Sequence, residues 1–327
     1  TKYHATPTDV FREAGFSIAI WANHLLRSAV VAMQATARTL ARDQNLQSVE
    51  DHIAPVKELF RLQDASELQA AEERYLPQPQ VRSRAVILAA SRGSALGELT
   101  EQRPKTMVNV RGRPLLSHIV AAYNAAGIKR INVVRGYLPA AVDLPSLTYT
   151  DNAEYADTSE LVSLAKALEA DPDDTMDLYV SYGDVIFNRY ILDALGESDD
   201  GITIVADTDW RESVNRGRAA DYVTCTLPHS RRTFYQPSYL ERAAEDLPEE
   251  RIHGEWMGFL RVTAAAMPRF RATVLKQAGA PANRQAKLHH LLTTLVESGE
   301  RVRVLYTTGH WLDVDSLDDV VAAGSFS

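Results

Sequence analysis

One lysine and three aspartates stand out in this 327-residue sequence because of where they fall. Lys105 stands twelve residues after Gly93, behind a loop of mostly small residues. Asp184 ends an apolar stretch, while Asp313 and Asp315 alternate with apolar residues and so share one face of an extended strand. A lysine can neutralise a phosphate group, and carboxylates from separate strands suit Mg²⁺. The sequence therefore predicts a metal and phosphate site at one edge of a sheet.

The loop from Ala89 to Ser94 is the expected phosphate cradle. It follows an apolar strand predicted over 85–90, and its small residues let backbone N–H groups approach an anion. Neither a G-x-G-x-x-G pattern nor a Gly-Lys-Ser/Thr sequence is present, which argues against a dinucleotide fingerprint and a P-loop. Each feature alone is common, since small residues form ordinary turns and lysines and aspartates populate surfaces. The prediction depends on their occurrence together.

Loop, lysine and carboxylates together indicate nucleotidyl transfer. That chemistry consists mainly of positioning and charge stabilisation, with a metal bridging substrate oxygens. We find no Ser-His-Asp or Cys-His arrangement for a covalent nucleophile, and the nine histidines show no metal-ligand spacing. His289 and His290 are expected on a helix, facing different ways. Cys225, the single cysteine, is expected to be a buried, unreactive thiol.

The chain has two unlike parts. Residues 1–77 read as mostly helical, and residues 78–83 as a polar linker. Residues 84–327 alternate apolar strands with helices, which predicts an α/β fold with a doubly wound, mostly parallel sheet. In the first part we expect a strand over 17–24, a helix over 25–44 and two short helices within 48–77. In the second we expect strands over 85–90, 107–110, 130–137, 177–187 and 201–208, helices over 114–128, 159–170 and 188–198, Asp318 and Asp319 in the first turn of a last helix, and an irregular insert over 208–262.

Composition excludes several classes of protein. The net charge is −8 and no basic block occurs, so a nucleic-acid partner is not expected. No apolar run approaches the roughly 18 residues that span a bilayer, so no membrane partner is expected either. A single cysteine fits a reducing, cytoplasmic setting.

Residues 84–327 resemble the sugar-nucleotide-type nucleotidyltransferases, whose fold is Rossmann-like. The family reads L-A-A-G-x-G-x-R-L followed by P-K, and here the text is "LAASRGSALGELTEQRPK". Ser91 stands where glycine is usual, and Ala95 stands where an arginine usually steadies the triphosphate. Arg92 is the expected substitute for that arginine. The resemblance implies nucleotide binding by the loop residues Leu88, Ala89, Ala90, Ser91, Arg92 and Gly93.

The blocks "VVRGYLPAAV", "DNAEYADTSELVSLAKAL", "SYGDVIF", "GEWMGFLRVT" and "WLDVDSLDDV" resemble more closely the group that makes CMP-activated choline or phosphonates. The resemblance implies that Asp184 and Asp315, with Asp313 nearby, hold Mg²⁺ and that Lys105 contacts phosphate. It places the acceptor beside Tyr182, Glu255 and Trp256. The expected border of the base and ribose is Gly136, Tyr137, Asn152, Thr158, Ser159, Glu160 and Gly183.

Residues 1–77 resemble the C-terminal end of phosphoenolpyruvate phosphomutase, a (β/α)₈ barrel. The catalytic aspartates and metal ligands of that family lie in earlier strands that this chain does not contain. The segment is therefore not expected to catalyse the mutase reaction. Because the mutase makes a carbon–phosphorus bond, a domain fused to it is expected to act on a phosphonate.

Three functions stay open at this point. The first is transfer of CMP from CTP to 2-aminoethylphosphonate or 2-hydroxyethylphosphonate. The second keeps the reaction class but uses phosphocholine or a sugar phosphate, with CTP or UTP as the nucleotide. A quaternary ammonium group would then need an aromatic cage, drawn from Tyr182, Trp210, Tyr239 and Trp256. The third is an inactive module that supports a mutase. The apolar surface of the helix over 25–44 leaves open a homo-oligomer formed through the mutase-like segment.

Overall fold

The computed structural model describes residues 4–63, 83–213, 220–233 and 235–326, in two compact units divided at Gln78 and Pro79. Among the described residues, no helix combines the length and the apolar character needed to cross a membrane. The predicted linker over 78–83 falls outside the described residues except for Ser83, which already begins a strand. The part of the 48–77 prediction beyond Gln63 also lies outside them.

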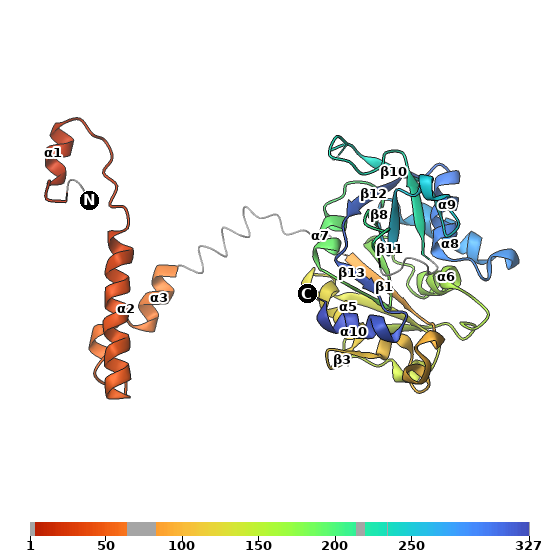
Figure 1. The fold of residues 1–327 in the computed structure, drawn as a ribbon, viewed down its shortest axis with the longest axis horizontal. Helices are drawn as coiled ribbons and strands as arrows, with labels where there is room; N and C mark the ends of the chain where they lie inside the picture. The colour runs from red at the N-terminus through yellow and green to blue at the C-terminus, as the bar shows by residue number, and fades with distance from the viewer. Residues whose placement is uncertain (1–3, 64–82, 214–219, 234, 327) are drawn as a thin grey trace. The chain divides into compact units, whose positions relative to one another are not determined.

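The described part of the first unit is helical (Figure 1). It contains α1 (Thr8–Glu13), α2 (His24–Asp43), the 3₁₀ turn η1 (Glu50–His52) and α3 (Val56–Gln63). The helix predicted over 25–44 is confirmed as α2, which ends where Gln44 adopts a left-handed conformation with φ of 51°.

The strand predicted over 17–24 is wrong. Residues 17–21 form no strand, and α2 already begins at His24. Ile18 and Ile20 are 77% and 85% exposed. A strand needs a neighbour for its backbone groups, and no described residue of this unit lies in a strand that could pair with it.

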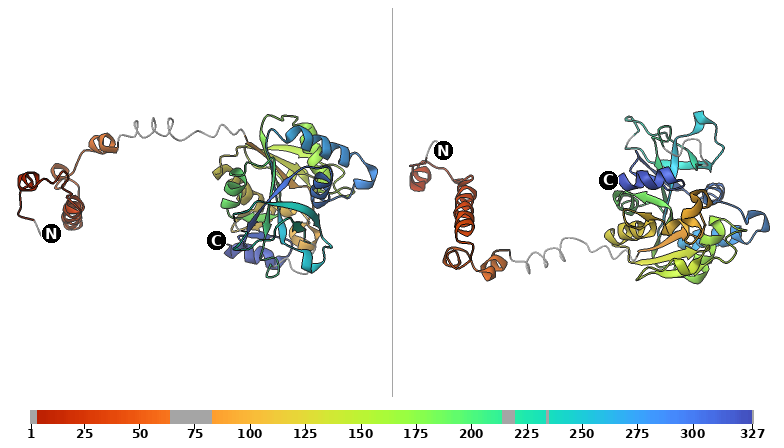
Figure 2. Two further views of the ribbon diagram at one scale, coloured as in Figure 1. Left: turned by 90° about the horizontal axis from the view of Figure 1, so that it is seen from above. Right: turned by 60° about the horizontal axis from the view of Figure 1, so that its bottom comes forward.

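The second unit is built on a nine-stranded sheet with helices on both faces (Figure 2). All of its strands run in one direction except β10 and β11. The predicted doubly wound, mostly parallel arrangement is therefore observed. The strands lie in the order β5 (Thr148–Asp151), β4 (Arg130–Arg135), β1 (Ser83–Ala89), β6 (Asp177–Tyr182), β11 (Gly254–Val262), β8 (Ile202–Asp207), β12 (Val302–Thr307), β10 (Ser238–Ala244) and β9 (Tyr222–Cys225).

Side-chain alternation along β1 explains the two helical layers. Val86 and Leu88 belong to one buried cluster, and Ala85, Ile87 and Ala89 belong to the other. The first cluster includes residues of α6 (Glu160–Ala170), α8 (Met267–Ala278) and α9 (Leu288–Glu297). The second includes residues of α5 (Leu115–Ala125), α7 (Tyr190–Gly196) and α10 (Leu317–Ser325).

The region 208–262 is more regular than predicted, because it contains β9, β10 and β11. Strand β11 lies antiparallel between β6 and β8 at the centre of the sheet, and all nine of its residues are buried. A strand covered on both faces shows no alternation of apolar and polar residues, so its sequence carries little periodic signal.

Short elements complete the second unit. Strands β2 (Asn109–Val110) and β3 (Arg113–Pro114) form one small hairpin, so the strand predicted over 107–110 is shorter than expected. Strands β7 (Val185–Phe187) and β13 (Trp311–Asp313) pair antiparallel in a two-stranded ribbon. The 3₁₀ turns are η2 (Ser94–Thr100), η3 (Lys105–Met107), η4 (Pro139–Ala141), η5 (Glu249–Arg251) and η6 (Pro281–Asn283).

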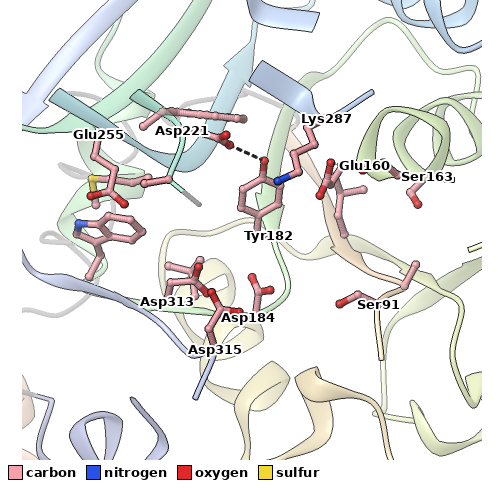
Figure 3. A pocket seen from close by; sticks show the side chains of 18 of the residues that line it. Ser91, Glu160, Ser163, Tyr182, Asp184, Asp221, Glu255, Lys287, Asp313 and Asp315 are labelled. Atoms are coloured by element: carbon pink, nitrogen blue, oxygen red, sulfur yellow. Dashed lines mark hydrogen bonds between the residues drawn. The ribbon is translucent and has the colours of Figure 1, made fainter. Parts of the chain in front are cut away.

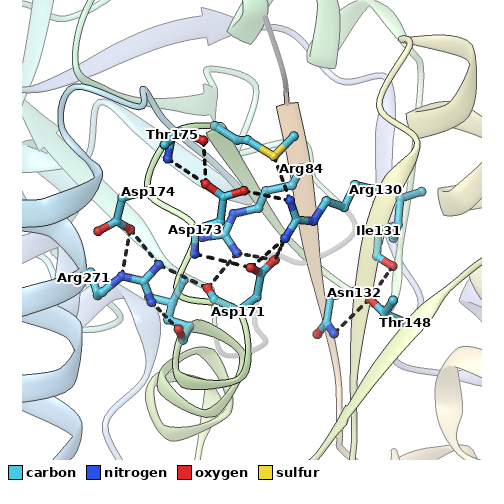
Figure 4. A network of polar contacts seen from close by, with 12 residues as sticks. Arg84, Arg130, Ile131, Asn132, Thr148, Asp171, Asp173, Asp174, Thr175 and Arg271 are labelled. Atoms are coloured by element: carbon cyan, nitrogen blue, oxygen red, sulfur yellow. Dashed lines mark hydrogen bonds and ion pairs between the residues drawn. The ribbon is translucent and has the colours of Figure 1, made fainter.

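A cluster of charged side chains supports the start of β1 (Figure 4). Arg84 is only 2% exposed and pairs with the carboxylate of Asp171 at 2.9 Å. Arg130 pairs with the same carboxylate at 2.8 Å, and Arg271 donates to the Asp171 carbonyl oxygen at 3.2 Å. Burial lowers the pKa of Arg84, which the charge of Asp171 opposes. Asp171 is therefore the anion that allows a guanidinium to stay buried here.

We expect Asp171→Ala to lower the free energy of unfolding by about 3 kcal/mol, because it leaves Arg84 buried without its counter-charge. Urea unfolding followed by circular dichroism would measure the loss. Asp193→Ala is the matched control, since Asp193 pairs with Arg189 on an exposed surface and should contribute only about 0.3–0.5 kcal/mol. Equal losses in the two variants would show that Asp171 does not stabilise Arg84.

Candidate active site

A pocket of about 370 Å³ opens at the carboxyl ends of β1 and β6 (Figure 3). Carboxyl ends of parallel strands are the usual ligand-binding edge of an α/β sheet. Many of the predicted site residues line it, together with several that were not predicted. The lining consists of Leu88, Ala90, Ser91, Tyr155, Thr158, Ser159, Glu160, Ser163, Tyr182, Asp184, Val185, Ala220, Asp221, Glu255, Trp256, Met257, Lys287, Trp311, Asp313 and Asp315.

Lys105 and the three aspartates predicted from the sequence meet at one side of this pocket. The ammonium nitrogen of Lys105 lies 2.8 Å from Asp184 Oδ2 and 3.7 Å from Asp313 Oδ1, and it also pairs with Asp315. The lysine is only 5% exposed, whereas the Asp315 side chain is 43% exposed. The lysine of this cluster is therefore buried, whereas solvent can reach the cluster at Asp315.

Local backbone contacts bring these carboxylates together. Asp184 precedes β7 and Asp313 ends β13, so the pairing of the two strands sets the aspartates side by side. The N–H of Val314 also donates to the Asp184 carbonyl at 3.0 Å. Asp319, in the first turn of α10 as predicted, accepts from the N–H of Asp315 at 3.0 Å and forms a capping box with Ser316. The capping interaction fixes the backbone from which Asp315 extends.

The electrostatics of the cluster follow from burial. Desolvation by itself lowers the pKa of Lys105, but Asp184, Asp313 and Asp315 outweigh it and hold that pKa well above its ordinary value. Burial raises the pKa of Asp313 well above its ordinary value, and the neighbouring charge of Asp184 raises it further. One ammonium group thus faces three carboxylates, which leaves capacity for a further cation.

The carboxylates fit a magnesium ion by donor type and spacing. Asp184, Asp313 and Asp315 each offer an oxygen atom, and the three atoms lie within 4.8 Å of one another. A hard cation such as Mg²⁺ prefers oxygen ligands and takes one or two protein carboxylates along with water and phosphate oxygens. These residues would hold the ion, and the loop stays the predicted site of the neighbouring phosphates.

The loop after β1 is packed directly against Lys105. Gly93 has φ of +74°, and a Cβ atom there would lie 2.5 Å from Lys105 Cβ. The N–H of Lys105 donates to the Arg92 carbonyl at 3.1 Å. Glycine at this position therefore leaves room for the Lys105 side chain, which passes the loop and reaches the carboxylates.

Gly136 and Gly183, both predicted to border the nucleotide, pack closely against the loop backbone. Gly183 donates its N–H to the Leu88 carbonyl at 2.8 Å, and a Cβ on it would lie 2.7 Å from Ala89 Cβ. A Cβ on Gly136 would lie 2.5 Å from the Ala90 carbonyl oxygen. Neither glycine is among the residues that line the pocket, and their expected contact with the nucleotide stays a prediction.

Tyr137 and Arg92 also lie outside the pocket lining. The Tyr137 hydroxyl donates to the Glu101 carbonyl at 2.7 Å, and the Arg92 guanidinium lies 5.4 Å from the centre of the Tyr137 ring. This cation–π arrangement links the loop to the segment after β4. The expected role of Arg92 in steadying a triphosphate stays a prediction.

Asn152, Thr158 and Ser159 organise the start of α6. Asn152 is buried, and its Nδ2 donates to Thr158 Oγ1 at 3.0 Å and to Ser163 Oγ at 3.1 Å. Ser159 stands at the N-cap, and its hydroxyl donates to Glu160 at 2.6 Å. Burial raises the pKa of Glu160. Asn152 thus holds two pocket-lining hydroxyl groups in place without lining the pocket itself.

Asp221 and Lys287 line the pocket and were missed by the sequence analysis. Asp221 accepts from the Tyr182 hydroxyl at 3.2 Å and pairs with His289 Nδ1 at 2.6 Å. Lys287 pairs with Glu245. Neither belongs to a recognisable motif, and both reach the pocket only through tertiary packing. Ser163, Met257 and Trp311 also line the pocket. They lie within the family-like sequence blocks, but no site role was predicted for them.

The aromatic cage considered for a quaternary ammonium group is not assembled. Tyr182 and Trp256 lie together in the pocket with ring centres 5.7 Å apart. Trp210 packs instead against Tyr222, and Tyr239 lies beneath the guanidinium of Arg301. Neither is among the lining residues, so two of the four aromatic side chains are available to a ligand here.

Two predictions about unused groups are confirmed. His289 and His290 lie in the first turn of α9, and they face different ways, since His289 is buried and His290 is exposed. Their ring centres nevertheless lie only 4.1 Å apart. The contact arises because His289 is turned inward to Asp221 and the ring of His290 lies against it. Cys225 is buried as predicted, and burial raises the pKa of its thiol to about 12.

Comparisons with known proteins find relatives of both parts of the chain. A 76-residue stretch is 50% identical to phosphoenolpyruvate phosphomutase of Tetrahymena pyriformis, covering 23% of this chain and 25% of that protein. The chain thus spans only a quarter of the length of the phosphomutases it matches. A 93-residue stretch is 30% identical to 2-aminoethylphosphonate cytidylyltransferase of Lancefieldella rimae, covering 27% of this chain and 38% of that protein.

Broader but weaker likenesses cover most of the second unit. A UTP–glucose-1-phosphate uridylyltransferase of Haloferax volcanii is 28% identical over 246 residues, which cover 72% of this chain and 92% of that protein. The solved inositol-1-phosphate CTP transferase of T. maritima superposes with a TM-score of 0.60 at 17% identity, over 76% of this chain and 96% of its own. This structural likeness confirms the predicted α/β nucleotidyltransferase fold, while the barrel origin of residues 1–77 stays a prediction.

The family follows from a match that spans more than half of the chain. The model of the MobA-like NTP transferase domain matches residues 85–257, which include the loop, Lys105 and Asp184. The predicted enzyme class, nucleotidyltransferase, is thereby confirmed. This chain belongs to the MobA-like NTP transferase domain family.

Proposed function

We propose that this enzyme transfers CMP from CTP to a small phosphonate in a Mg²⁺-dependent reaction that releases pyrophosphate. The observation that carries the proposal is the convergence of Lys105 on Asp184, Asp313 and Asp315 directly beside the loop after β1. On this proposal the loop is a phosphate cradle, Lys105 is a fixed cation and the three aspartates are an oxygen-only metal site.

The reaction is a substitution at the α-phosphorus of CTP. A phosphonate oxygen of the acceptor forms the new P–O bond, and the bond from the α-phosphorus to the bridging oxygen breaks, so that pyrophosphate leaves with its electron pair. A bound Mg²⁺ supplies charge stabilisation on the phosphate oxygens. The protein orients both substrates. No covalent enzyme intermediate is needed, because the phosphonate oxygen attacks the α-phosphorus directly.

Lys105 has a distinct part in this reaction. Its pKa, held above the ordinary value by three carboxylates, keeps it charged throughout the neutral pH range. If Asp184, Asp313 and Asp315 hold a metal ion, the Lys105 ammonium would be free to pair with phosphate oxygens of CTP and of the leaving pyrophosphate. Lys105 thus offsets the negative charge of the three aspartates when no ligand is bound. It would offset the negative charge of the phosphates when they bind.

The choice of CTP and a phosphonate is supported by the relatives rather than by the pocket alone. One relative is a 2-aminoethylphosphonate cytidylyltransferase, and another stretch of the chain is half identical to a phosphomutase. Fusion of a nucleotidyltransferase to a segment from a phosphonate-forming family favours a phosphonate acceptor. The segment itself covers a quarter of the phosphomutase, so no mutase activity is proposed.

A second candidate function is nucleotidyl transfer from UTP to a sugar phosphate. The uridylyltransferase of Haloferax volcanii is 28% identical to this chain over 72% of its length. Carboxylates such as Asp221 and Glu255 could accept hydrogen bonds from sugar hydroxyls. The two functions differ in both nucleotide and acceptor, so one panel of substrates separates them.

The proposed function predicts pyrophosphate release with Mg²⁺, CTP and a phosphonate. The panel is 2-aminoethylphosphonate, 2-hydroxyethylphosphonate, phosphocholine and glucose 1-phosphate, each with CTP and with UTP. Asp184→Ala should reduce kcat by about 100-fold or more, because it removes a metal-facing carboxylate. The exposed Asp193→Ala is the control and should leave the rate unchanged. Release only with UTP and glucose 1-phosphate would support the second candidate instead.

A further prediction concerns metal binding and Lys105. Lys105→Met removes the ammonium that neutralises the carboxylates, so the metal-free protein should melt at a lower temperature. Added Mg²⁺ should raise the melting temperature more in this variant than in the wild type, because the ion no longer competes with the lysine. Turnover should nevertheless fall by about 100-fold.

Differential scanning fluorimetry across a Mg²⁺ titration measures this effect without relying on activity. Lys129→Met is the matched control, since Lys129 is exposed and donates only to the Asn124 carbonyl. An identical Mg²⁺-dependent shift in all three proteins would show that Lys105 and the metal do not share the carboxylates.

A further inference from the structure

Trp311 forms part of the wall between two pockets. Its side chain lines the candidate active site of about 370 Å³ and also a second pocket of about 330 Å³ beside α10. Trp311 and Asp313 alternate with Leu312 along β13, so their side chains lie on the same face of that strand. The indole therefore stands next to the metal-facing aspartates.

The indole is tied to one buried carboxylate. Nε1 of Trp311 donates to Oδ2 of Asp207 at 2.8 Å, and Asp207 is only 3% exposed. Asp207 is the last residue of β8, so its carboxylate extends from a strand inside the large sheet. A hydrogen bond to a carboxylate is stronger than one between neutral groups, and more so where water is excluded. This bond fixes the tilt of the indole ring.

The other oxygen of Asp207 holds the turn that leads into β13. Oδ1 accepts from the N–H of Gly309 at 3.0 Å and from the N–H of Asp209 at 2.9 Å. Gly309 and His310 both adopt left-handed conformations, with φ of 60° and 62°. Such a conformation is uncommon for a residue other than glycine, so the turn needs contacts that hold it in place. Asp207 supplies one of them.

An ordinary role for Asp207 would be to cap this turn. Two of its three hydrogen bonds fit that role, because aspartate side chains commonly accept from nearby backbone N–H groups. The bond to Trp311 does not fit it, since it joins the turn to a side chain that lines the active site. The second pocket gives a reason to fix that side chain, because it leaves space on the other side of the indole.

We propose that Asp207 is a positioning residue that locks the Trp311 indole as the active-site wall beside Asp313, so that the acceptor rather than water reaches the α-phosphorus. The inference rests on the proposed function and adds a pair of residues to the same site.

Water is the competing nucleophile in this reaction. Its oxygen forms a bond to the α-phosphorus of CTP and loses a proton to solvent, while the bond to the bridging oxygen breaks and pyrophosphate leaves with its electron pair. The products are CMP and pyrophosphate. Active sites that exclude water suppress such side reactions. A wall that has lost its hydrogen bond and has space behind it should admit water and hold the acceptor less well.

The test measures CMP and the CMP-acceptor product in the same reaction, with the phosphonate that the substrate panel identifies. Asp207→Asn replaces an accepting oxygen by a donor, so it can no longer serve both the turn and the indole. We expect the ratio of transfer to hydrolysis to fall by about 10-fold or more, and the KM for the acceptor to rise. The ratio does not depend on the fraction of folded protein, so a merely structural role would leave it unchanged.

Three comparisons isolate the bond between Asp207 and Trp311. Trp311→Phe keeps an aromatic ring without the N–H and should lower the ratio by a similar factor. The double variant should lose no more than either single variant, because residues that act through one contact are not additive. Asp209→Asn removes an exposed carboxylate two residues along the chain, outside the active-site lining, and should leave the ratio unchanged.

NMR of protein with ¹⁵N-labelled tryptophan observes the bond without relying on activity. Trp311→Phe assigns the indole N–H signal by its loss. In Asp207→Asn this signal should shift and exchange faster with solvent, whereas in Asp209→Asn it should not. An indole signal that is the same in Asp207→Asn and the wild type would overturn the inference.

The kinetic outcomes separate the inference from the function on which it rests. Transfer to a phosphonate with an unchanged ratio in Asp207→Asn, or additive losses in the double variant, would overturn the inference and leave the proposed function standing. If Asp207→Asn does not fold, Trp311→Phe removes the same bond from its other partner, and an unchanged ratio there has the same meaning. No transfer to any phosphonate by the wild type would overturn both.

Discussion

The buried ammonium group of Lys105 is the interaction on which the site depends. An isolated ammonium could not remain 5% exposed without counter-charges, and three aspartates within 4 Å of its nitrogen supply them. The requirement acts in both directions, because three carboxylates would also repel one another without the lysine. The loop glycine, the β7–β13 ribbon and the α10 cap all serve to bring these four side chains to one point.

The parts of the site that the sequence revealed are those set by local patterns. Alternation of Asp313 and Asp315 with apolar neighbours, the apolar strand before Asp184, and the small residues before Gly93 each carry their own signal over a few residues. The helix α2 and the alternating strands and helices of the second unit were likewise visible, because amphipathic periodicity is a local property.

The parts that sequence reasoning missed depend on contacts between distant segments. Strand β11 is buried on both faces and shows no alternation, and its place between β6 and β8 brings Glu255 and Trp256 to the pocket. Asp221 and His289 are 68 positions apart in the sequence, so no motif joins them. The strand expected over 17–24 failed for the opposite reason: its apolar residues resemble a strand locally, but the described unit offers no partner strand.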